Sequence, residues 1–219
     1  DTIIAGLLHD VVEDCEISLK TVKKEFGTNV AKLVDGMTKL LQLDDKLKDQ
    51  SQAEYFQKMA LATAEDVRVV IIKLADRLHN LQTIEHLPRE KQIKKARETL
   101  ELYAPLAHQI GMHKMATDLE DHAFKTIHPF RHKLIEQALK KNELNRKTLI
   151  SKVKKTLRAK FKKNEVPADT KGRRKRIYSI YQKMKSKNRS FGDIYDVFAF
   201  RVTVEKVEEC YKVLGIIHN

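Results

Sequence analysis

Apolar residues recur at helical spacing along most of the chain. The clearest stretch is 28–41, in which five apolar side chains would share one helical face: Val30, Leu33, Val34, Met37 and Leu40. The same spacing and the capping residues predict further helices at 2–15, 18–26, 51 to about 62, 66–83, 88 to about 104, 118–126, 129 to about 163, 178–187 and 205–214. The polar residues 42–51 predict a loop, and Pro105 predicts a boundary or kink.

The pattern changes in the last quarter of the chain. Residues 164–172 are polar and contain both a proline and a glycine, which indicates a boundary or a functional loop. Residues 196–204 then alternate as a strand does, with four apolar side chains on one face: Phe198, Phe200, Val202 and Val204. We therefore expect a mainly α protein that ends in the opening of an α/β domain.

Composition supports a helix-rich protein with a real core. Hydrophobic residues make up 42% of the 219 residues, and glycine (7) and proline (4) are scarce. No apolar run of about 20 residues occurs, so we expect no membrane span, and we see no secretory leader. The two cysteines, Cys15 and Cys210, stand far apart in the sequence, which suits a reducing, cytoplasmic location better than a disulfide framework.

The net charge of +13 lies entirely in the second half of the chain. Residues 1–100 contain 16 Lys and Arg against 17 Asp and Glu, whereas residues 101–219 contain 27 against 13. A strongly basic surface attracts phosphate groups on nucleotides, RNA or lipids. The alternative is a solvated basic face that has no partner.

Four polar residues near the start would share one face of the first helix: His9, Asp10, Glu13 and Asp14. They follow apolar residues of the same helix, so this face would begin beside a core. An imidazole next to a carboxylate can hold a divalent cation, and the remaining carboxylates can orient or deprotonate a water molecule. The alternative is a helix end whose acidic residues are simply solvated.

A second polar stripe is predicted on the helix at 66–83. Lys73, Asp76, Asn80 and Thr83 are spaced three, four and three residues apart, so they would line up on one face of an otherwise apolar helix. Asp76 could complete a metal site, while Asn80 and Thr83 could hydrogen-bond a ligand. The alternative is a surface ion pair of Asp76 with Lys73 or Arg77.

Together these motifs resemble a known family. His-Asp-x-x-Glu-Asp, followed after 67 residues by the aspartate of Lys-Leu-Ala-Asp-Arg-Leu-His-Asn, is similar to the hydrolase domain of RelA/SpoT homologues, within the HD phosphohydrolase superfamily. Residues 103–111 and 119–124 also resemble that domain. Residues 172–184 resemble the opening of the synthetase domain of the same family.

The resemblance implies a fold and an activity. It implies an HD-type, all-helical hydrolase domain at 1–128, a basic helical connector at 129–165, and the start of an α/β, nucleotidyltransferase-like synthetase domain at 166–219. The implied activity is metal-dependent removal of the 3′-pyrophosphate of ppGpp or pppGpp, which gives GDP or GTP and pyrophosphate. Relatives that have lost hydrolysis carry a degraded His-Asp-x-x-Glu-Asp motif, and here the motif is intact.

The resemblance also implies roles for individual residues. The metal ligands, usually for Mn²⁺, would be His9, Asp10 and Asp76. Glu13 and Asp14 would position and activate the attacking water, and the substrate would contact Lys73, Asn80 and Thr83. This assignment agrees with the chemistry of a bound cation, which lowers the pKa of water and screens the charge of pyrophosphate. One further histidine ligand of the family is expected upstream of Asp1, which leaves three protein ligands of an expected four.

The synthetase resemblance is less complete. It implies that Arg173, Lys175 and Lys183 grip the triphosphate of ATP and that Asp196 binds Mg²⁺, and a cationic loop suits that role. The alternative is a generic basic patch. Later elements of that domain are expected beyond Asn219, so we expect no synthesis by this chain alone. Relatives contact the ribosome through C-terminal regions, which are also expected beyond it.

Two other functions remain open at this stage. One is a catalytically silent nucleotide sensor with an HD fold, which would bind ppGpp without turnover. The other is a nucleic-acid-binding module that uses the basic stretch 131–189, although that stretch has few interleaved aromatic residues and no recognised RNA-binding motif. Strong RNA binding with a steep salt dependence would favour the latter.

Overall fold

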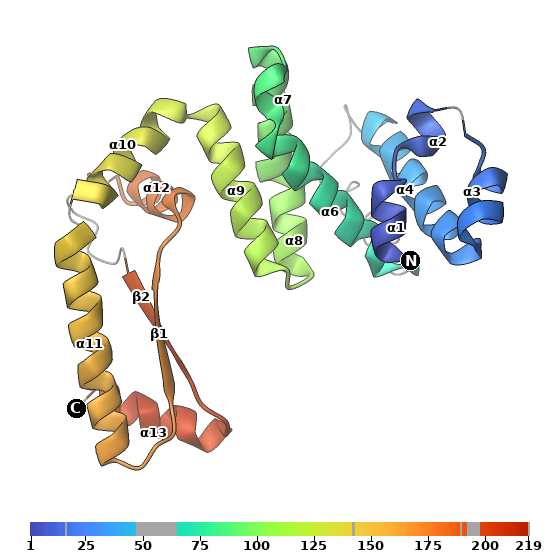
Figure 1. Cartoon of the computed structure of the whole chain (residues 1–219). Helices are drawn as coiled ribbons and strands as arrows, with labels where there is room; N and C mark the ends of the chain where they lie inside the picture. Colours follow the sequence, from blue (N-terminus) through green and yellow to red (C-terminus); the bar gives the residue numbers. More distant parts are fainter. Residues whose placement is uncertain (16, 47–64, 142, 189, 192–197, 219) are drawn as a thin grey trace. The chain divides into compact units, whose positions relative to one another are not determined.

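The computed structural model describes residues 1–15, 17–46, 65–141, 143–188, 190–191 and 198–218 (Figure 1). The chain divides into two compact units, residues 1–127 and 128–219. The prediction of a mainly α protein is confirmed. None of the described helices is long and apolar enough to cross a membrane.

The first unit is built from helices alone in its described part. In chain order these are α1 (Thr2–Leu7), α2 (Val11–Asp14), α3 (Leu19–Phe26), α4 (Thr28–Lys46), α6 (Val67–Gln82), the 3₁₀ turn η1 (Ile84–His86), α7 (Arg89–Glu98), the π turn η2 (Thr99–Tyr103), α8 (Ala104–Gln109) and α9 (His113–Ile127). Helix α6 packs against both α4 and α9, and its buried residues include Val70 and Leu74. One continuous core of buried apolar side chains links these helices.

The capping signals in the sequence set the helix boundaries. Ser18 caps α3, because its Oγ accepts a hydrogen bond from the backbone N–H of Thr21 at 3.2 Å. Gly27 ends that helix at a φ of 89°, which favours glycine. Asp66 caps α6 by accepting from the N–H of Arg68 at 3.0 Å. The helices predicted at 18–26, 28–41 and 66–83 are therefore confirmed.

The single buried helix predicted at 2–15 is wrong. The structure has two short helices, separated by a turn at residues 8–10, and Ile3 and Leu7 are 81% and 79% exposed. Within this turn the His9 side chain donates a hydrogen bond to the Gly6 carbonyl at 2.9 Å. In a continuous helix the N–H of Asp10 would bond the same carbonyl, so the side-chain contact competes with the helix.

The loop predicted at 42–51 is wrong over its first part, because α4 continues to Lys46. Leucine, lysine and glutamine form helices readily, so a polar segment can extend a helix that is already nucleated. The helix predicted from Ser51 lies outside the described residues.

Pro105 stands at the start of α8, so the predicted boundary there is confirmed, but the chain does not leave the helix. The π turn η2 joins α7 directly to α8. Because the chain stays helical from η2 into α8, the missing N–H of Pro105 leaves one hydrogen bond of this helix unmade. The N–H of Ala104, just before it, closes the π turn on the Thr99 carbonyl.

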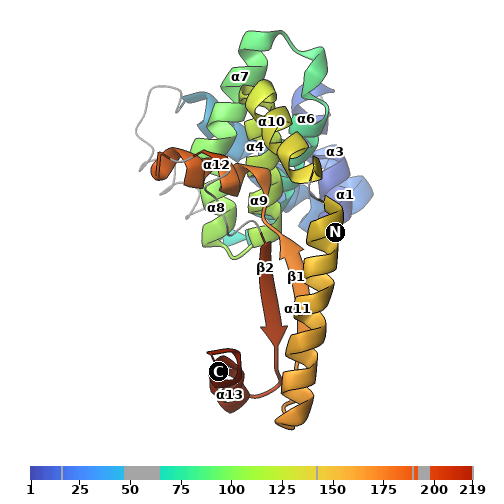
Figure 2. The same ribbon diagram turned by 90° about the vertical axis from the view of Figure 1, so that its left-hand side faces the viewer.

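The second unit combines helices with a small sheet. Its elements are α10 (Pro129–Lys141), α11 (Glu143–Lys163), β1 (Asp169–Arg174), α12 (Ile177–Ser186), β2 (Phe198–Thr203) and α13 (Val207–His218). In the described part β1 and β2 form a two-stranded antiparallel sheet, in which Asp169 pairs with Thr203 and Arg174 with Phe198. Figure 2 shows this ribbon running alongside α11. Phe161, Val166 and Val213 form the small core beside it.

Two predictions for the second unit need correction. The single helix predicted at 129–163 is two helices, α10 and α11. The loop predicted at 164–172 ends at Asp169, where β1 begins. This strand is polar and does not alternate, so it follows from pairing with β2 and not from its own pattern. Gly172 lets β1 lie close to the side chains of Ile150 on α11 and Phe200 on β2, because a Cβ atom at position 172 would lie 3.0 Å from Ile150 and 3.3 Å from Phe200.

Replacing Gly36 with alanine is expected to destabilise the first unit. A Cβ atom at position 36 would lie 2.8 Å from Cγ2 of Val69, which is buried on α6. Alanine gains up to about 1 kcal/mol in helix propensity, but overpacking costs about 1–3 kcal/mol. Urea denaturation should therefore show a net loss of about 1 kcal/mol. In a Val69→Ala chain, which lacks the clashing methyl group, the added Gly36→Ala change should cause no such loss. A single variant as stable as the wild type would contradict the close contact.

Candidate active site

The structure brings the two predicted polar clusters of the first unit together. Helix α1 packs against α4 and α6 (Figure 1). The turn that follows α1 places His9 in contact with Asp76 of α6. His9 Nε2 lies 2.8 Å from Asp10 Oδ2 and 3.4 Å from Asp76 Oδ1. Residues 67 positions apart in the sequence are thus in direct contact.

The orientation of His9 leaves one ring nitrogen facing the carboxylates. The Nδ1–H group donates to the Gly6 carbonyl at 2.9 Å, which leaves the lone pair on Nε2. Nε2 is buried and has no hydrogen bond of acceptable geometry, although Asp10 is close. A lone pair that faces two carboxylates is repelled by them unless a proton or a metal cation lies between them.

These atoms fit a partial metal site. Neighbouring ligand atoms around a cation bound at about 2.1 Å lie roughly 3.0–3.4 Å apart, and the two distances from His9 Nε2 are close to these values. Among the described residues, however, no group of three or more His, Cys, Asp or Glu side chains is placed so that it could hold a metal ion by itself. The trio would therefore need further ligands, such as water or substrate.

Asp76 is held by two neighbours on its own helix. The Asn80 amide donates to Asp76 Oδ1 at 2.7 Å, and Lys73 Nζ lies 3.8 Å from Asp76 Oδ2. Lys73 is buried, with only 4% of its surface exposed. A buried ammonium group compensates the charge of the carboxylates and fixes where they point.

The pKa of Asp10 reflects the crowding of charge at this site. The pKa of the Asp10 carboxyl is raised, and burial is the largest cause. The negative charges of Asp76 and Asp14 raise this pKa further, whereas His9 and Lys73 lower it. Glu13 and Asp14 are exposed on the short helix α2. Asp14 is close enough to act on Asp10 through its charge.

Thr83 is the predicted site residue that the structure places apart from the cluster. It follows the last residue of α6, and its hydroxyl donates to the backbone carbonyl of His79 at 3.1 Å. The stripe predicted on α6 is therefore brought together at Lys73, Asp76 and Asn80 only.

The comparisons with known proteins identify the unit that carries this site. The family model of the HD domain matches residues 1–113, more than half of the chain. The chain belongs to the HD domain family. A second family model, described as a region found in RelA and SpoT proteins, matches residues 172–219.

Several curated relatives match the HD domain and the RelA/SpoT region together. The chain is 42% identical over 219 residues to a guanosine-3′,5′-bis(diphosphate) 3′-pyrophosphohydrolase of Vibrio cholerae. The aligned residues make up 100% of this chain and 31% of the relative. The bifunctional (p)ppGpp synthase/hydrolase SpoT of Escherichia coli K12 gives the same values. A GTP pyrophosphokinase of Streptomyces coelicolor is 45% identical over 219 residues, 99% of this chain and 25% of the relative. The chain thus spans about a third or less of their length.

The resemblance that the motifs indicated is therefore confirmed, and so is the HD-type fold. All the residues proposed for the hydrolase site lie within the part that matches the HD domain. The metal, the roles of single residues and the division into three segments stay predictions.

The HD domain also contains a buried cation that sequence reasoning misplaced. The sequence allows Arg77 as a surface partner of Asp76. In the structure its Nη2 lies 3.1 Å from Glu98 Oε2, and its guanidinium carbon lies 4.1 Å from the centre of the Tyr103 ring. Burial would lower the pKa of Arg77, but Tyr103 and Glu98 stabilise the cation, so this pKa is raised. No pattern in the sequence indicates this contact, because its partners lie on another helix.

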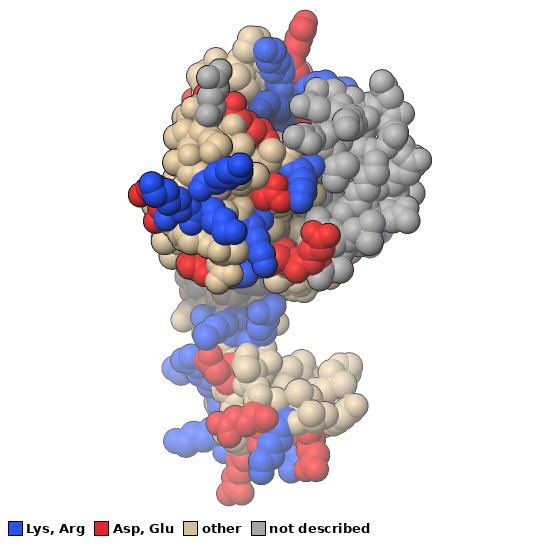
Figure 3. All heavy atoms as spheres, turned by 90° about the vertical axis from the view of Figure 1, so that its right-hand side faces the viewer, with Lys and Arg blue, Asp and Glu red and all other residues tan. Residues whose placement is uncertain are grey.

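The RelA/SpoT region gathers part of its predicted cation cluster. The Lys175 ammonium group, by its hydrogen-bonding contact and its charge, lowers the pKa of Lys183, which shows that the two lie close together. Arg173 lies on β1 opposite Ala199, and Asp196 lies outside the described residues. Adjacent cations of this kind suit a polyanion such as a triphosphate. On the face of the HD domain in Figure 3, by contrast, basic and acidic side chains are interspersed.

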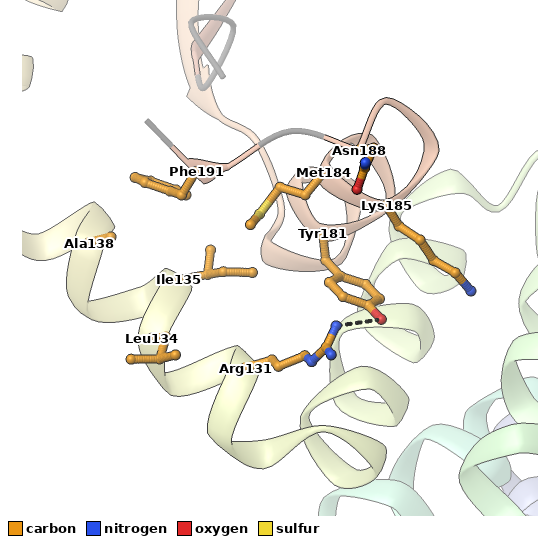
Figure 4. Close-up of a pocket in the computed structure, with 9 residues that line it drawn as sticks. All are labelled: Arg131, Leu134, Ile135, Ala138, Tyr181, Met184, Lys185, Asn188 and Phe191. Carbon is orange, nitrogen blue, oxygen red and sulfur yellow. Dashed lines mark hydrogen bonds between the residues drawn. The ribbon is translucent and has the colours of Figure 1, made fainter. Parts of the chain in front are cut away.

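A pocket of about 580 Å³ lies between α10 and α12 (Figure 4). Its lining is mainly apolar, and Arg131 Nη1 donates to the Tyr181 hydroxyl at 3.4 Å at its edge. Tyr181 and Lys183 are two residues apart, which places them about 200° apart around α12. The pocket therefore lies on the other side of the helix from Lys183, and no pattern of residues in the sequence predicts it.

Proposed function

We propose that the HD domain of this chain is a divalent-cation-dependent phosphohydrolase that removes the 3′-pyrophosphate of ppGpp or pppGpp, giving GDP or GTP and pyrophosphate. The observation that carries this proposal is the buried Nε2 of His9, which faces the carboxylates of Asp10 and Asp76 without a hydrogen bond. The names of the relatives support the choice of substrate.

His9, Asp10 and Asp76 would hold the cation, for which we propose Mn²⁺. When bound, the cation supplies positive charge that acidifies a water molecule and screens the pyrophosphate. Lys73 and Asn80 orient Asp76, and the buried ammonium group of Lys73 also attracts the anionic substrate. Thr83 would use the lone pairs of its hydroxyl to accept from the nucleotide while it continues to donate to His79.

Glu13 and Asp14 would handle the proton of the reaction. Both are exposed beside the cluster, where a water molecule can reach them. The water oxygen attacks the phosphorus next to the ribose 3′-oxygen, and one of these carboxylates accepts its proton. The bond from that phosphorus to the 3′-oxygen breaks. A proton then goes to the 3′-oxygen, and pyrophosphate leaves as one unit.

For the RelA/SpoT region we propose the opening of a synthetase domain that transfers pyrophosphate from ATP to GTP or GDP in the complete protein. Arg173, Lys175 and Lys183 would contact the ATP triphosphate, and Asp196 would bind Mg²⁺. Any contact with the ribosome would come from regions outside this chain. We place the protein in the cytoplasm, where its exposed free cysteines, Cys15 and Cys210, would stay reduced.

Replacing His9 with glutamine is expected to weaken Mn²⁺ binding by at least about tenfold, because glutamine cannot supply the imidazole lone pair. Titration of Mn²⁺ followed by electron paramagnetic resonance measures the free ion directly. His86→Gln is the matched control, since His86 is exposed on η1 and should bind Mn²⁺ as the wild type does. Equal affinity in the wild type and His9→Gln would remove the proposed metal site.

A further inference from the structure

Arg77 ties α6 to the segment formed by α7 and η2. Arg77 follows Asp76 directly, and consecutive helical residues point about 100° apart. While Asp76 faces His9, the guanidinium of Arg77 lies over the Tyr103 ring at 4.1 Å and 3.1 Å from Glu98 Oε2. Its side chain is only 12% exposed, and Tyr103 is fully buried. The arginine is therefore held at two points, one buried at Tyr103 and one partly exposed at Glu98.

The π turn makes this two-point contact possible. Glu98 ends α7 and Tyr103 ends η2, five residues later. In a regular α-helix, residues five apart point about 140° away from each other. The i→i+5 closure of a π turn brings them onto nearly the same side. Thr99 braces the turn, because its buried hydroxyl donates to the carbonyl of Lys95 at 2.8 Å.

The rotation of α6 about its own axis sets the place of the Asp76 carboxylate. A side-chain tip lies roughly 5–6 Å from the helix axis, so a rotation of about 20° moves it by about 2 Å. A site that holds a cation tolerates errors of about 0.5 Å. The contact of Asp76 with His9 at 3.4 Å therefore depends on this rotation. Apolar packing against α4 and α9 sets the rotation in outline, and the Arg77 contacts add two polar anchors to it. The Asn80 and Lys73 contacts add none, because both residues turn with α6.

We infer that Glu98 and Tyr103 are positioning residues for Asp76. Through Arg77 they fix the rotation of α6, and so they set where Asp76 stands relative to His9. The π turn is the part of the fold that presents both residues to one guanidinium group. The consequence for metal binding rests on the proposed function, whereas the effect on the geometry of Asp76 and His9 does not.

The test uses three substitutions and one control in the chain. Tyr103→Leu removes the ring under the guanidinium, and Tyr103→Phe keeps that ring. Glu98→Gln removes one negative charge, and because the Glu98 side chain is one third exposed, this substitution should have little effect on folding. Val22→Ala is the control, because it opens a cavity in the core on α3, away from Arg77. All variants are compared at a temperature where thermal melts show them fully folded.

Two readouts separate positioning from general stability. The first is the imidazole NMR signals of His9 in the metal-free chain, assigned with His9→Gln. We expect these signals to shift in Tyr103→Leu and Glu98→Gln, and to match the wild type in Val22→Ala. In Tyr103→Phe the shift should be smaller, because the ring is kept and only the hydroxyl contact with Arg77 is lost. The second is the Mn²⁺ dissociation constant, which should rise about tenfold in Tyr103→Leu and stay within about twofold in Val22→Ala.

Unchanged His9 signals in both Tyr103→Leu and Glu98→Gln would overturn the inference, as would an equal shift in Val22→Ala. If the wild type binds no Mn²⁺ while the His9 signals respond as expected, the positioning role stands and the proposed function fails.

Discussion

Replacing Asp76 with asparagine should lower the rate of pyrophosphate release from ppGpp by about a thousandfold or more. The change is isosteric, but it removes the negative charge that faces His9 and that pairs with the buried Lys73. The contribution of a bound cation to the transition state is several kcal/mol, and about 4 kcal/mol corresponds to a factor of about a thousand. Initial rates with saturating Mn²⁺ in the complete protein encoded by the gene provide the measurement.

Asp35→Asn is the matched control for this substitution. Asp35 lies on α4 and pairs with the exposed Lys39 at 2.7 Å, on the surface of the same domain. The same loss of one carboxylate charge there should leave the rate unchanged within about twofold. If Asp76→Asn kept more than a tenth of the wild-type rate, Asp76 would not be a metal ligand.

Replacing Lys73 with methionine should destabilise the metal-free chain by about 2–3 kcal/mol. Removing one partner of a fully buried ion pair costs about 3–5 kcal/mol, and Asp76 keeps its Asn80 contact, which reduces the loss. Methionine retains most of the apolar stem, so packing changes little. Saturating Mn²⁺ should recover most of this loss, because the cation replaces the missing positive charge and binds only the folded state.

Chemical denaturation with and without Mn²⁺ checks this expectation, with Lys39→Met as the control. Lys39 makes an exposed pair with Asp35, and such pairs contribute about 0–1 kcal/mol. A metal-free Lys73→Met chain as stable as the wild type would show that the ammonium group does not compensate the acidic cluster.

The helices that carry the site could be predicted from the sequence where their patterns are local. The apolar residues of α4 recur over several turns, so the helix at 28–41 follows from their spacing. The helix at 66–83 follows from its apolar spacing together with the capping residue Asp66. The polar stripe on α6 also followed from spacing as far as Asn80. Its contact with His9 followed only from the resemblance to a family, because spacing within one helix says nothing about another.

The features that sequence patterns did not predict depend on contacts or hydrogen bonds that such patterns do not describe. At the turn of residues 8–10 the His9 side chain donates to the carbonyl of Gly6, and helix propensities do not include a contact of this kind. Strand β1 is polar and becomes a strand only by pairing with β2. Pro105 marked a boundary, but nothing local distinguishes a π turn from a chain break. Arg77 pairs with Glu98, which lies 21 residues further along the chain.

The most direct test of the central claim is the product of ppGpp incubated with the complete protein, with and without Mn²⁺. Chromatography with nucleotide and pyrophosphate standards identifies each species. We predict GDP and intact pyrophosphate in equal amounts, formed only with Mn²⁺ and not by His9→Gln. Tight binding of ppGpp without any cleavage would contradict the hydrolase assignment and would favour a nucleotide sensor with an HD fold.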